Sequence, residues 1–262
     1  MVICGKVDMW ARFKKESSKK DNSSCELLID RGFFPTIGTL IMHILFWAVM
    51  MLMFPLYLLK IKNRKYFFSV LNNKRGAISV ANHCYYLDSG FISLALFPHF
   101  TNYAVDEHTM SVKFLGYFLK RIGGFPVSQT NFRPLYNTIG HLLKKNRIVH
   151  LFPEGNMLDY NQRVAEFERG AFYFALAYDA PILPIAIVLK KRPLLRFLTK
   201  PLPRVEVHLC KPIYLEAYKE LGLSHKELLS KIASDVQTII DQKIQEEGGD
   251  YTLFAGKIDH KI

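Results

Sequence analysis

Ala77-Ile78-Ser79-Val80-Ala81 is a short run of small and β-prone residues, and Asn82-His83-Cys84-Tyr85-Tyr86-Leu87-Asp88 follows it directly. Residues 87–97 beyond this stretch are mostly apolar. A β-prone run, a connection and a longer apolar run predict a strand followed by a turn and a helix. Because connections of this kind often display reactive groups, His83 and Asp88 are candidates for a catalytic pair.

The sequence on both sides of this stretch alternates between β-prone and helical runs. Such alternation predicts an α/β fold with a central, mostly parallel sheet flanked by helices. A final amphipathic stretch at 224–246 begins with the capping-box pair Ser224 and Glu227 and is expected to pack on the sheet. The other expected strands are 102–105, 124–127, 148–152, 182–189 and 204–209, and the other expected helices are 111–121, 132–145 and 168–178.

Composition limits the class of function. The chain has 262 residues, 50% of them hydrophobic, and a formal net charge of +12. This length predicts one large domain with an appendage, and the positive charge predicts an anionic partner, either nucleic acid, a membrane surface or a phosphorylated substrate. Four scattered cysteines without C-x-x-C spacing indicate neither a disulfide framework nor a metal site. No nucleic-acid-binding module is recognisable, so no nucleic-acid partner is expected.

The apolar residues are concentrated near the start of the chain. Residues 1–32 form a polar tail, and residues 33–59 carry no charge, so we expect 33–70 to be a membrane-associating helical segment. It could span the bilayer, or Pro35, Gly38 and Pro55 could divide it into two half-length helices within one leaflet. A buried core helix is the third alternative. For a spanning helix, the cations Lys60, Lys62, Arg64 and Lys65 predict a catalytic domain on the cytoplasmic side.

His83 and Asp88 can cooperate only in a particular local geometry. Five residues apart on a straight helix, they would point roughly 140° away from each other. If a turn precedes the helix, Asp88 can accept the Nδ1 proton of His83 and leave Nε2 to take a proton from a hydroxyl. The alternative is a capped helix start with a surface histidine. A Cys84 nucleophile is disfavoured, because its base would be its own neighbour in the sequence.

A second motif adds to the first. His150-Leu151-Phe152-Pro153-Glu154-Gly155 places Pro-Glu-Gly directly after an expected strand. Together, N-H-x4-D and F-P-E-G resemble the glycerolipid acyltransferases of the lysophosphatidic acid acyltransferase type. The resemblance covers about residues 74–212 and includes two further blocks, 167–171 and 180–185, in the expected order.

The resemblance implies an O-acyltransferase domain at 71–215, followed by a C-terminal helix and tail at 216–262. His83 would be the general base, Asp88 would orient it, and Glu154 and Gly155 would belong to the acceptor site. The implied reaction moves a fatty acyl group from acyl-CoA or acyl-carrier protein to the hydroxyl of a lysophospholipid, first of all 1-acyl-glycerol-3-phosphate, without a further cofactor. Implied partners are these donors, the lysolipid and membrane lipids.

Two positions depart from the family pattern. Gln129 stands where the family has an arginine that meets the acceptor phosphate, and Asn156-Met157 replaces a Thr-Arg pair. A buried phosphate needs charged hydrogen-bond donors, so a different lipid acceptor without a phosphate anchor, or a non-catalytic lipid-binding scaffold, are alternative functions. If the acceptor does carry a phosphate, the candidate substitutes are Arg133, Arg163 and Arg169.

Basic residues accumulate in two acid-free stretches. Residues 108–153 contain no Asp or Glu, and residues 190–204 interleave cations with leucine and phenylalanine. The first stretch is suited to steering an anionic donor or surface. The second predicts either a contact with the membrane interface or an ordinary basic loop. The cations of the first stretch include Lys113, Lys120, Arg121, Arg133, Lys144, Lys145 and Arg147.

Overall fold

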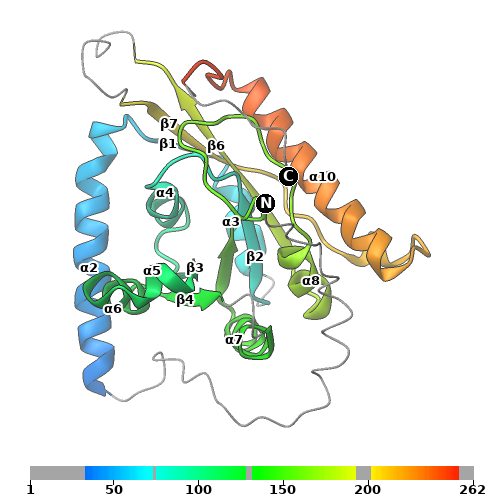
Figure 1. Ribbon diagram of the computed structural model, residues 1–262, viewed down its shortest axis with the longest axis horizontal. Coiled ribbons are helices and arrows are strands. Elements are labelled where there is room, and N and C mark those ends of the chain that lie inside the picture. Colours follow the sequence, from blue (N-terminus) through cyan, green and yellow to red (C-terminus); the bar gives the residue numbers. More distant parts are fainter. Residues whose placement is uncertain (1–32, 73–74, 128–131, 193–201, 254–262) are drawn as a thin grey trace, which may run out of the picture.

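The computed structural model describes residues 33–72, 75–127, 132–192 and 202–253. Within these residues, seven strands form one sheet in the order β1-β7-β6-β2-β5-β3-β4 (Figure 1). β2, which leads into the His83 turn, lies in the middle of the sheet. The strands are β1 (Lys60–Lys62), β2 (Ala77–Ala81), β3 (Thr101–Asp106), β4 (Gly124–Val127), β5 (Ile148–Leu151), β6 (Ile182–Lys190) and β7 (Arg204–Leu209).

The sheet is mostly parallel, as the alternating pattern predicted. β2 pairs in parallel with both β5 and β6, and β3 pairs in parallel with β4 and β5. β6 and β7 are antiparallel. Because β2, β5, β3 and β4 run the same way, the loops that follow them leave from one edge of the sheet, where the ligand sites of parallel sheets are found.

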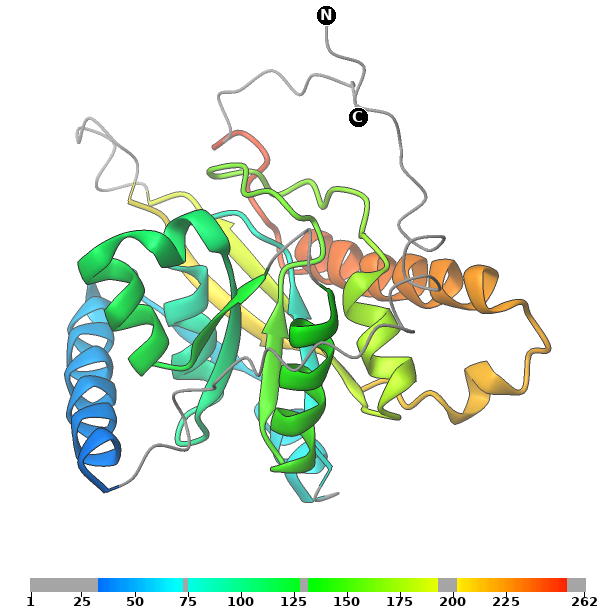
Figure 2. The same ribbon diagram turned by 60° about the horizontal axis from the view of Figure 1, so that its bottom comes forward.

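Helices cover both faces of the sheet, so the fold has three layers (Figures 1 and 2). On one face, Ile139, Phe172 and Ile232 are fully buried and belong to a single core. On the other, Phe67 and Phe91 belong to a second core. The helices are α2 (Phe33–Leu56), α3 (Lys65–Asn72), α4 (Asp88–Ala95), α5 (Glu107–Ser111), α6 (Lys113–Arg121), α7 (Phe132–Lys144), α8 (Gly170–Ala177), α9 (Glu216–Lys219) and α10 (His225–Glu246).

α2 is one continuous helix of 24 residues. The division at Pro35, Gly38 and Pro55, one of the three alternatives that the sequence left open, does not occur. Pro35 lies in the first turn, where a backbone N–H has no helical acceptor, and Pro55 lies in the last turn. Among the described residues, no helix has both the length and the apolar character required to cross a membrane.

Some expectations fall outside the described residues, and some elements were not predicted. The polar tail at 1–32, Gln129 and residues 193–201 of the predicted basic interfacial stretch are among the residues that are not described. β1, α3, α5 and α9 were not predicted, because elements of three to eight residues are too short to show a period. The capping box of Ser224 and Glu227 is present at the start of α10.

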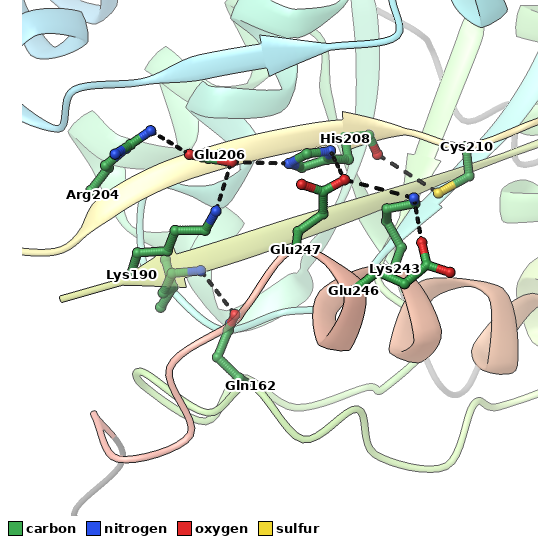
Figure 3. Close-up of polar contacts among 10 residues, drawn as sticks. Gln162, Lys190, Arg204, Glu206, His208, Cys210, Lys243, Glu246 and Glu247 are labelled. Atoms are coloured by element: carbon green, nitrogen blue, oxygen red, sulfur yellow. Dashed lines mark hydrogen bonds and ion pairs between the residues drawn. The ribbon is translucent and has the colours of Figure 1, made fainter.

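A buried polar cluster ties the end of α10 to the sheet (Figure 3). Glu206 of β7 accepts from Lys190 Nζ at 2.9 Å and from Arg204 at 2.6 Å. His208 Nε2 lies 3.3 Å from Glu206, and its Nδ1 lies 3.5 Å from Glu247. Glu206, His208 and Glu247 are close enough to share a cation, but the two basic side chains on Glu206 already balance its charge. The cluster is therefore an ion-pair network that fixes α10 on β7.

Candidate active site

The turn between β2 and α4 brings His83 and Asp88 together. β2 ends at Ala81 and α4 starts at Asp88, so the intervening residues are not helical. His83 Nδ1 lies 3.0 Å from Asp88 Oδ2. The same oxygen accepts the backbone N–H groups of Cys84 and Tyr85, each at 2.8 Å. The carboxylate thus shapes the turn that presents the histidine, which is the geometry that the spacing required.

Asp88 and His83 differ in their access to solvent. The Asp88 side chain is fully buried, whereas 23% of the His83 side chain is exposed. Burial is the largest influence on the pKa of Asp88 and raises it, and the hydrogen bonds from His83, Cys84 and Tyr85 act in the opposite direction. With Nδ1 directed at the carboxylate, Nε2 is the imidazole nitrogen available to a substrate.

The His83 ring is supported from one side by Phe152. The two rings are stacked, with centroids 3.9 Å apart and an interplanar angle of 13°. The ring of His150 lies edge-on to the same phenylalanine, with centroids 4.5 Å apart. Burial lowers the pKa of His150 to about 3, so this second histidine is neutral at physiological pH. Phe152 therefore restricts the rotation of the His83 imidazole without adding a charge.

Glu154 joins the two sequence motifs. Its Oε1 accepts the backbone N–H of His83 at 2.9 Å, and its Oε2 accepts the backbone N–H of Ala165 at 3.2 Å. Both carboxylate oxygens are thus used in holding loops together. Gly155 follows with φ +72°, a left-handed conformation that favours glycine. The Pro-Glu-Gly motif therefore lies against the turn of His83, where Glu154 positions the backbone of His83.

Asn82 and Gln162 anchor the surrounding loops on β6. Asn82 exchanges two hydrogen bonds with the backbone of Ile187, at 2.8 and 3.0 Å. Gln162 accepts from the backbone N–H of Leu189 at 2.8 Å. These side chains pair with the backbone of a strand more than 20 residues further along the chain, which fixes the turn of His83 on the sheet.

Glu154 also makes the stability of the fold depend on pH. Burial raises the pKa of Glu154 from its usual 4.5 to about 7. Between these pH values the folded protein binds a proton that the unfolded chain has released. The free energy of unfolding should therefore fall as the pH rises through this interval, by about 3 kcal/mol for this one group.

In the variant Glu154→Gln, the free energy of unfolding should lack this pH dependence, because the amide does not titrate. Urea denaturation of both proteins at about pH 5 and about pH 7.5 checks it. The wild-type protein should lose stability relative to Glu154→Gln on going to the higher pH. If the free energy of unfolding changes equally in both proteins between the two pH values, Glu154 does not titrate in this interval.

The candidate phosphate-binding arginines lie in three different places. Arg133 is exposed in the first turn of α7, which follows β4. Arg169 immediately precedes α8. Arg163 lines a hollow of about 680 Å³ shared with Gln237, Asp241 and Gln245 of α10, and neither His83 nor Asp88 lines that hollow. β4 and β5 both run in the direction of β2, so all three arginines follow strands that end at the edge of the sheet where His83 lies. Arg163 is set apart from the other two because it lines the hollow at α10.

Cys84 does not have the properties of a nucleophile. Its side chain is fully buried, and burial raises the pKa of the thiol further above its ordinary value. A thiolate is therefore disfavoured at this position. Cys210, the other cysteine among the described residues, is also a free and buried thiol.

Three contributions to the site were not found from the sequence. They are the stacking of Phe152 on His83, the hydrogen bond from the backbone of His83 to Glu154, and a group of three tyrosine hydroxyls. Tyr57, at the end of α2, lies with its hydroxyl 3.1 Å from that of Tyr85 and 3.0 Å from that of Tyr86. The contacting residues are separated by 28 to 71 positions. In the sequence, only the two motifs indicated that the segments around His83 and Glu154 lie close together.

Comparison with known proteins relates this site to an enzyme family. Residues 61–188 match the family model Acyltransferase. Over 112 residues the chain is 30% identical to the 1-acyl-sn-glycerol-3-phosphate acyltransferase of Bacillus subtilis (strain 168), covering 42% of this chain and 55% of that relative. The chain thus spans little more than half the length of this curated relative.

A solved structure shares the fold. The crystal structure of the 1-acyl-sn-glycerophosphate (LPA) acyltransferase PlsC from Thermotoga maritima matches with a TM-score of 0.51 and 17% sequence identity, covering 72% of this chain and 71% of the other. The matched family region, 61–188, contains both His83 and Glu154. Residues 61–188, just under half of the chain, are therefore similar to the acyltransferase family.

Proposed function

We propose that this protein is a membrane-associated O-acyltransferase that moves a fatty acyl group from a thioester to the hydroxyl of a lysophospholipid. The donor is acyl-CoA or acyl-carrier protein, and the first acceptor to test is 1-acyl-glycerol-3-phosphate, which would yield phosphatidic acid. The observation that carries the proposal is the partly exposed His83, with Nδ1 held 3.0 Å from the buried Asp88. This is the arrangement of an oriented general base.

The geometry suggests a direct transfer. His83 Nε2 takes the proton of the acceptor hydroxyl as the oxygen attacks the thioester carbonyl carbon. The C–S bond then breaks, the ester forms, and the thiol leaves with the proton returned by His83. Asp88 stabilises the imidazolium between these two steps, because its carboxylate accepts a hydrogen bond from Nδ1–H. The buried thiol of Cys84 argues against a covalent acyl-enzyme at that residue.

Membrane association is supported by the surface of α2. Its residues Leu40, Ile44 and Leu52 are each more than half exposed, although the helix carries no charge. Large exposed apolar patches on a protein surface mark interaction sites. The exposed Lys60 and Lys62 of β1 follow this helix, which supports an α/β domain on the cytoplasmic side, where anionic lipids attract cations.

The proposal is tested with radiolabelled acyl-CoA and acyl-carrier protein against a panel of lysolipids. The panel should contain 1-acyl-glycerol-3-phosphate, lysolipids with larger head groups, and monoacylglycerol as an acceptor without phosphate. Labelled phosphatidic acid is the expected product. Acylation of monoacylglycerol alone would favour the acceptor without a phosphate anchor, and no acylated lipid from any pair would favour a non-catalytic scaffold.

Arg133 is the first candidate to bind the acceptor phosphate in place of the arginines that the motifs lack. Arg133→Ala should raise the KM for 1-acyl-glycerol-3-phosphate about tenfold or more, because a charged hydrogen bond contributes about 1.5–3 kcal/mol. Its KM for a phosphate-free acceptor should not change. Arg163→Ala, at the hollow beside α10, is the matched control. Equal effects of both changes would exclude a specific role for Arg133.

A further inference from the structure

The exposed face of α2 is continuous with a second apolar surface. On its inner side, α2 contributes the buried Met50 and the partly buried Phe46 to the core against the sheet. Its outer side is apolar as well, which leaves that side without a partner among the described residues. The exposed residues of this outer side are Leu40, Ile41, Ile44, Leu45, Val49, Met51, Leu52 and Phe54.

α6 extends this surface from within the α/β domain. Phe118 of α6 contacts Phe46 of α2, with ring centroids 6.3 Å apart, and the two helices lie together in both views (Figures 1 and 2). Beside this contact, Phe114 is 91% exposed and Tyr117 is 57% exposed. Val112 and Leu115 are exposed too. Water is an unfavourable environment for a row of aromatic and aliphatic side chains of this size.

The charges of α6 indicate which kind of partner binds its exposed apolar face. At about 100° per residue, Lys113 and Lys120 lie about 20° apart and form a basic edge beside the face of Phe114 and Tyr117. Arg121 places its guanidinium 5.0 Å from the centre of the Tyr117 ring. No acidic residue occurs between 108 and 153. An amphipathic helix with aromatic residues on one face and lysines at its border is typical of helices that lie in the interface of an anionic membrane.

We propose that α6 is an interfacial helix that binds an anionic lipid bilayer, next to α2. The apolar surface of Val112, Phe114, Leu115 and Tyr117 enters the acyl region, and Lys113 and Lys120 meet lipid phosphates. The inference rests on the proposed membrane association of α2 and does not depend on turnover.

This contact would also orient the active site. α5 begins directly after β3, and β3 runs in the same direction as β2 in the sheet. The α5–α6 segment therefore starts at the edge of the sheet that carries the His83 turn. A bilayer that holds α2 and α6 would lie near that edge, where a lysolipid acceptor could reach His83 without leaving the membrane.

A depth measurement tests the proposal. Phe114→Cys, in a background with Cys4→Ser and Cys25→Ser, would carry an environment-sensitive fluorophore. Ser234→Cys, at an exposed position on α10, is the matched control. With vesicles that contain phosphatidylglycerol, the label at 114 should shift to shorter wavelength and be quenched by brominated lipids, whereas the label at 234 should stay accessible to iodide. Iodide access at 114 equal to that at 234 would overturn the proposal.

Vesicle preference gives a second test. Lys113→Gln/Lys120→Gln should reduce the preference for phosphatidylglycerol vesicles over phosphatidylcholine vesicles by about fivefold for each lysine removed. Lys226→Gln/Lys231→Gln on α10 removes the same charge and should leave the preference unchanged. Equal losses in both double variants would overturn the role of α6, because they would reflect net charge alone.

Two further controls separate the possible explanations. If the label at 114 is shielded without vesicles and the protein sediments as a dimer, a second copy of the chain covers α6 and the lipid proposal is wrong. The same measurements on His83→Ala should reproduce the wild-type response. An inactive protein with a normal label response would contradict only the proposed activity, and an active protein with an accessible label would contradict only the α6 contact.

Discussion

His83→Ala is expected to lower kcat for acyl transfer by about 10²–10⁴-fold, the usual contribution of a general base. Alanine removes the Nε2 atom that takes the acceptor proton and leaves the backbone N–H that binds Glu154. The turn should therefore keep its shape. Rates of radiolabelled acyl transfer to a lysolipid, measured at saturating donor and acceptor, give the size of the loss.

His225→Ala, which removes an exposed histidine at the start of α10, is the matched control and should keep wild-type activity. Binding to vesicles should be the same for both variants, because neither residue belongs to the apolar surface of α2 and α6. Near-normal turnover by purified His83→Ala protein would rule out the proposed base.

Asp88→Asn is expected to lower kcat by about 10³-fold or more, because the negative charge that orients His83 and stabilises its imidazolium is lost. The asparagine can still offer one oxygen to the N–H groups of Cys84 and Tyr85, so the turn can persist. That oxygen is also the one that faces His83 Nδ1, but the neutral amide cannot balance the positive charge of the imidazolium that forms during transfer. The same acyl-transfer assay measures the effect.

The double variant His83→Ala/Asp88→Asn distinguishes orientation of the base from a purely structural role. If Asp88 acts through His83, the double variant should be no slower than His83→Ala alone, since residues that act as a unit are not additive. Multiplied losses in kcat, together with a lower midpoint of urea denaturation, would show instead that Asp88 mainly supports the fold.

Local sequence was sufficient to predict most of the sheet. All six expected strands are present, and their ends differ from the prediction by at most one residue. Buried strands such as β6 are continuous apolar runs, and turns interrupt them, so the pattern along the chain is enough to find them. β1 was missed, because its three residues pair with β7 more than 140 positions away and show no pattern of their own.

The site was predicted to a smaller extent. Spacing left two alternatives open for His83 and Asp88, a pair joined by a turn or a capped helix start with a surface histidine, and the resemblance to the acyltransferases favoured the pair. The structure shows the pair. The residues of the acceptor site could not be predicted from spacing. Glu154 was assigned to the acceptor site by resemblance, and the structure shows its two oxygens bound to backbone N–H groups of the loops around His83. Gln129 lies outside the described residues. That Arg133 binds the acceptor phosphate in its place remains a prediction.

Short-range information thus accounts for the alternation of strands and helices, the turn at 82–88 and the apolar character of α2. These features depend on residues a few positions apart, which interact in nearly any fold that contains them. Three other features could be found only in the folded chain. They are the stack of Phe152 on His83, the hydrogen bond from the backbone of His83 to Glu154, and the apolar surface shared by α2 and α6. Each joins segments distant in sequence, and only the packing of the sheet and its helices determines which of those segments meet.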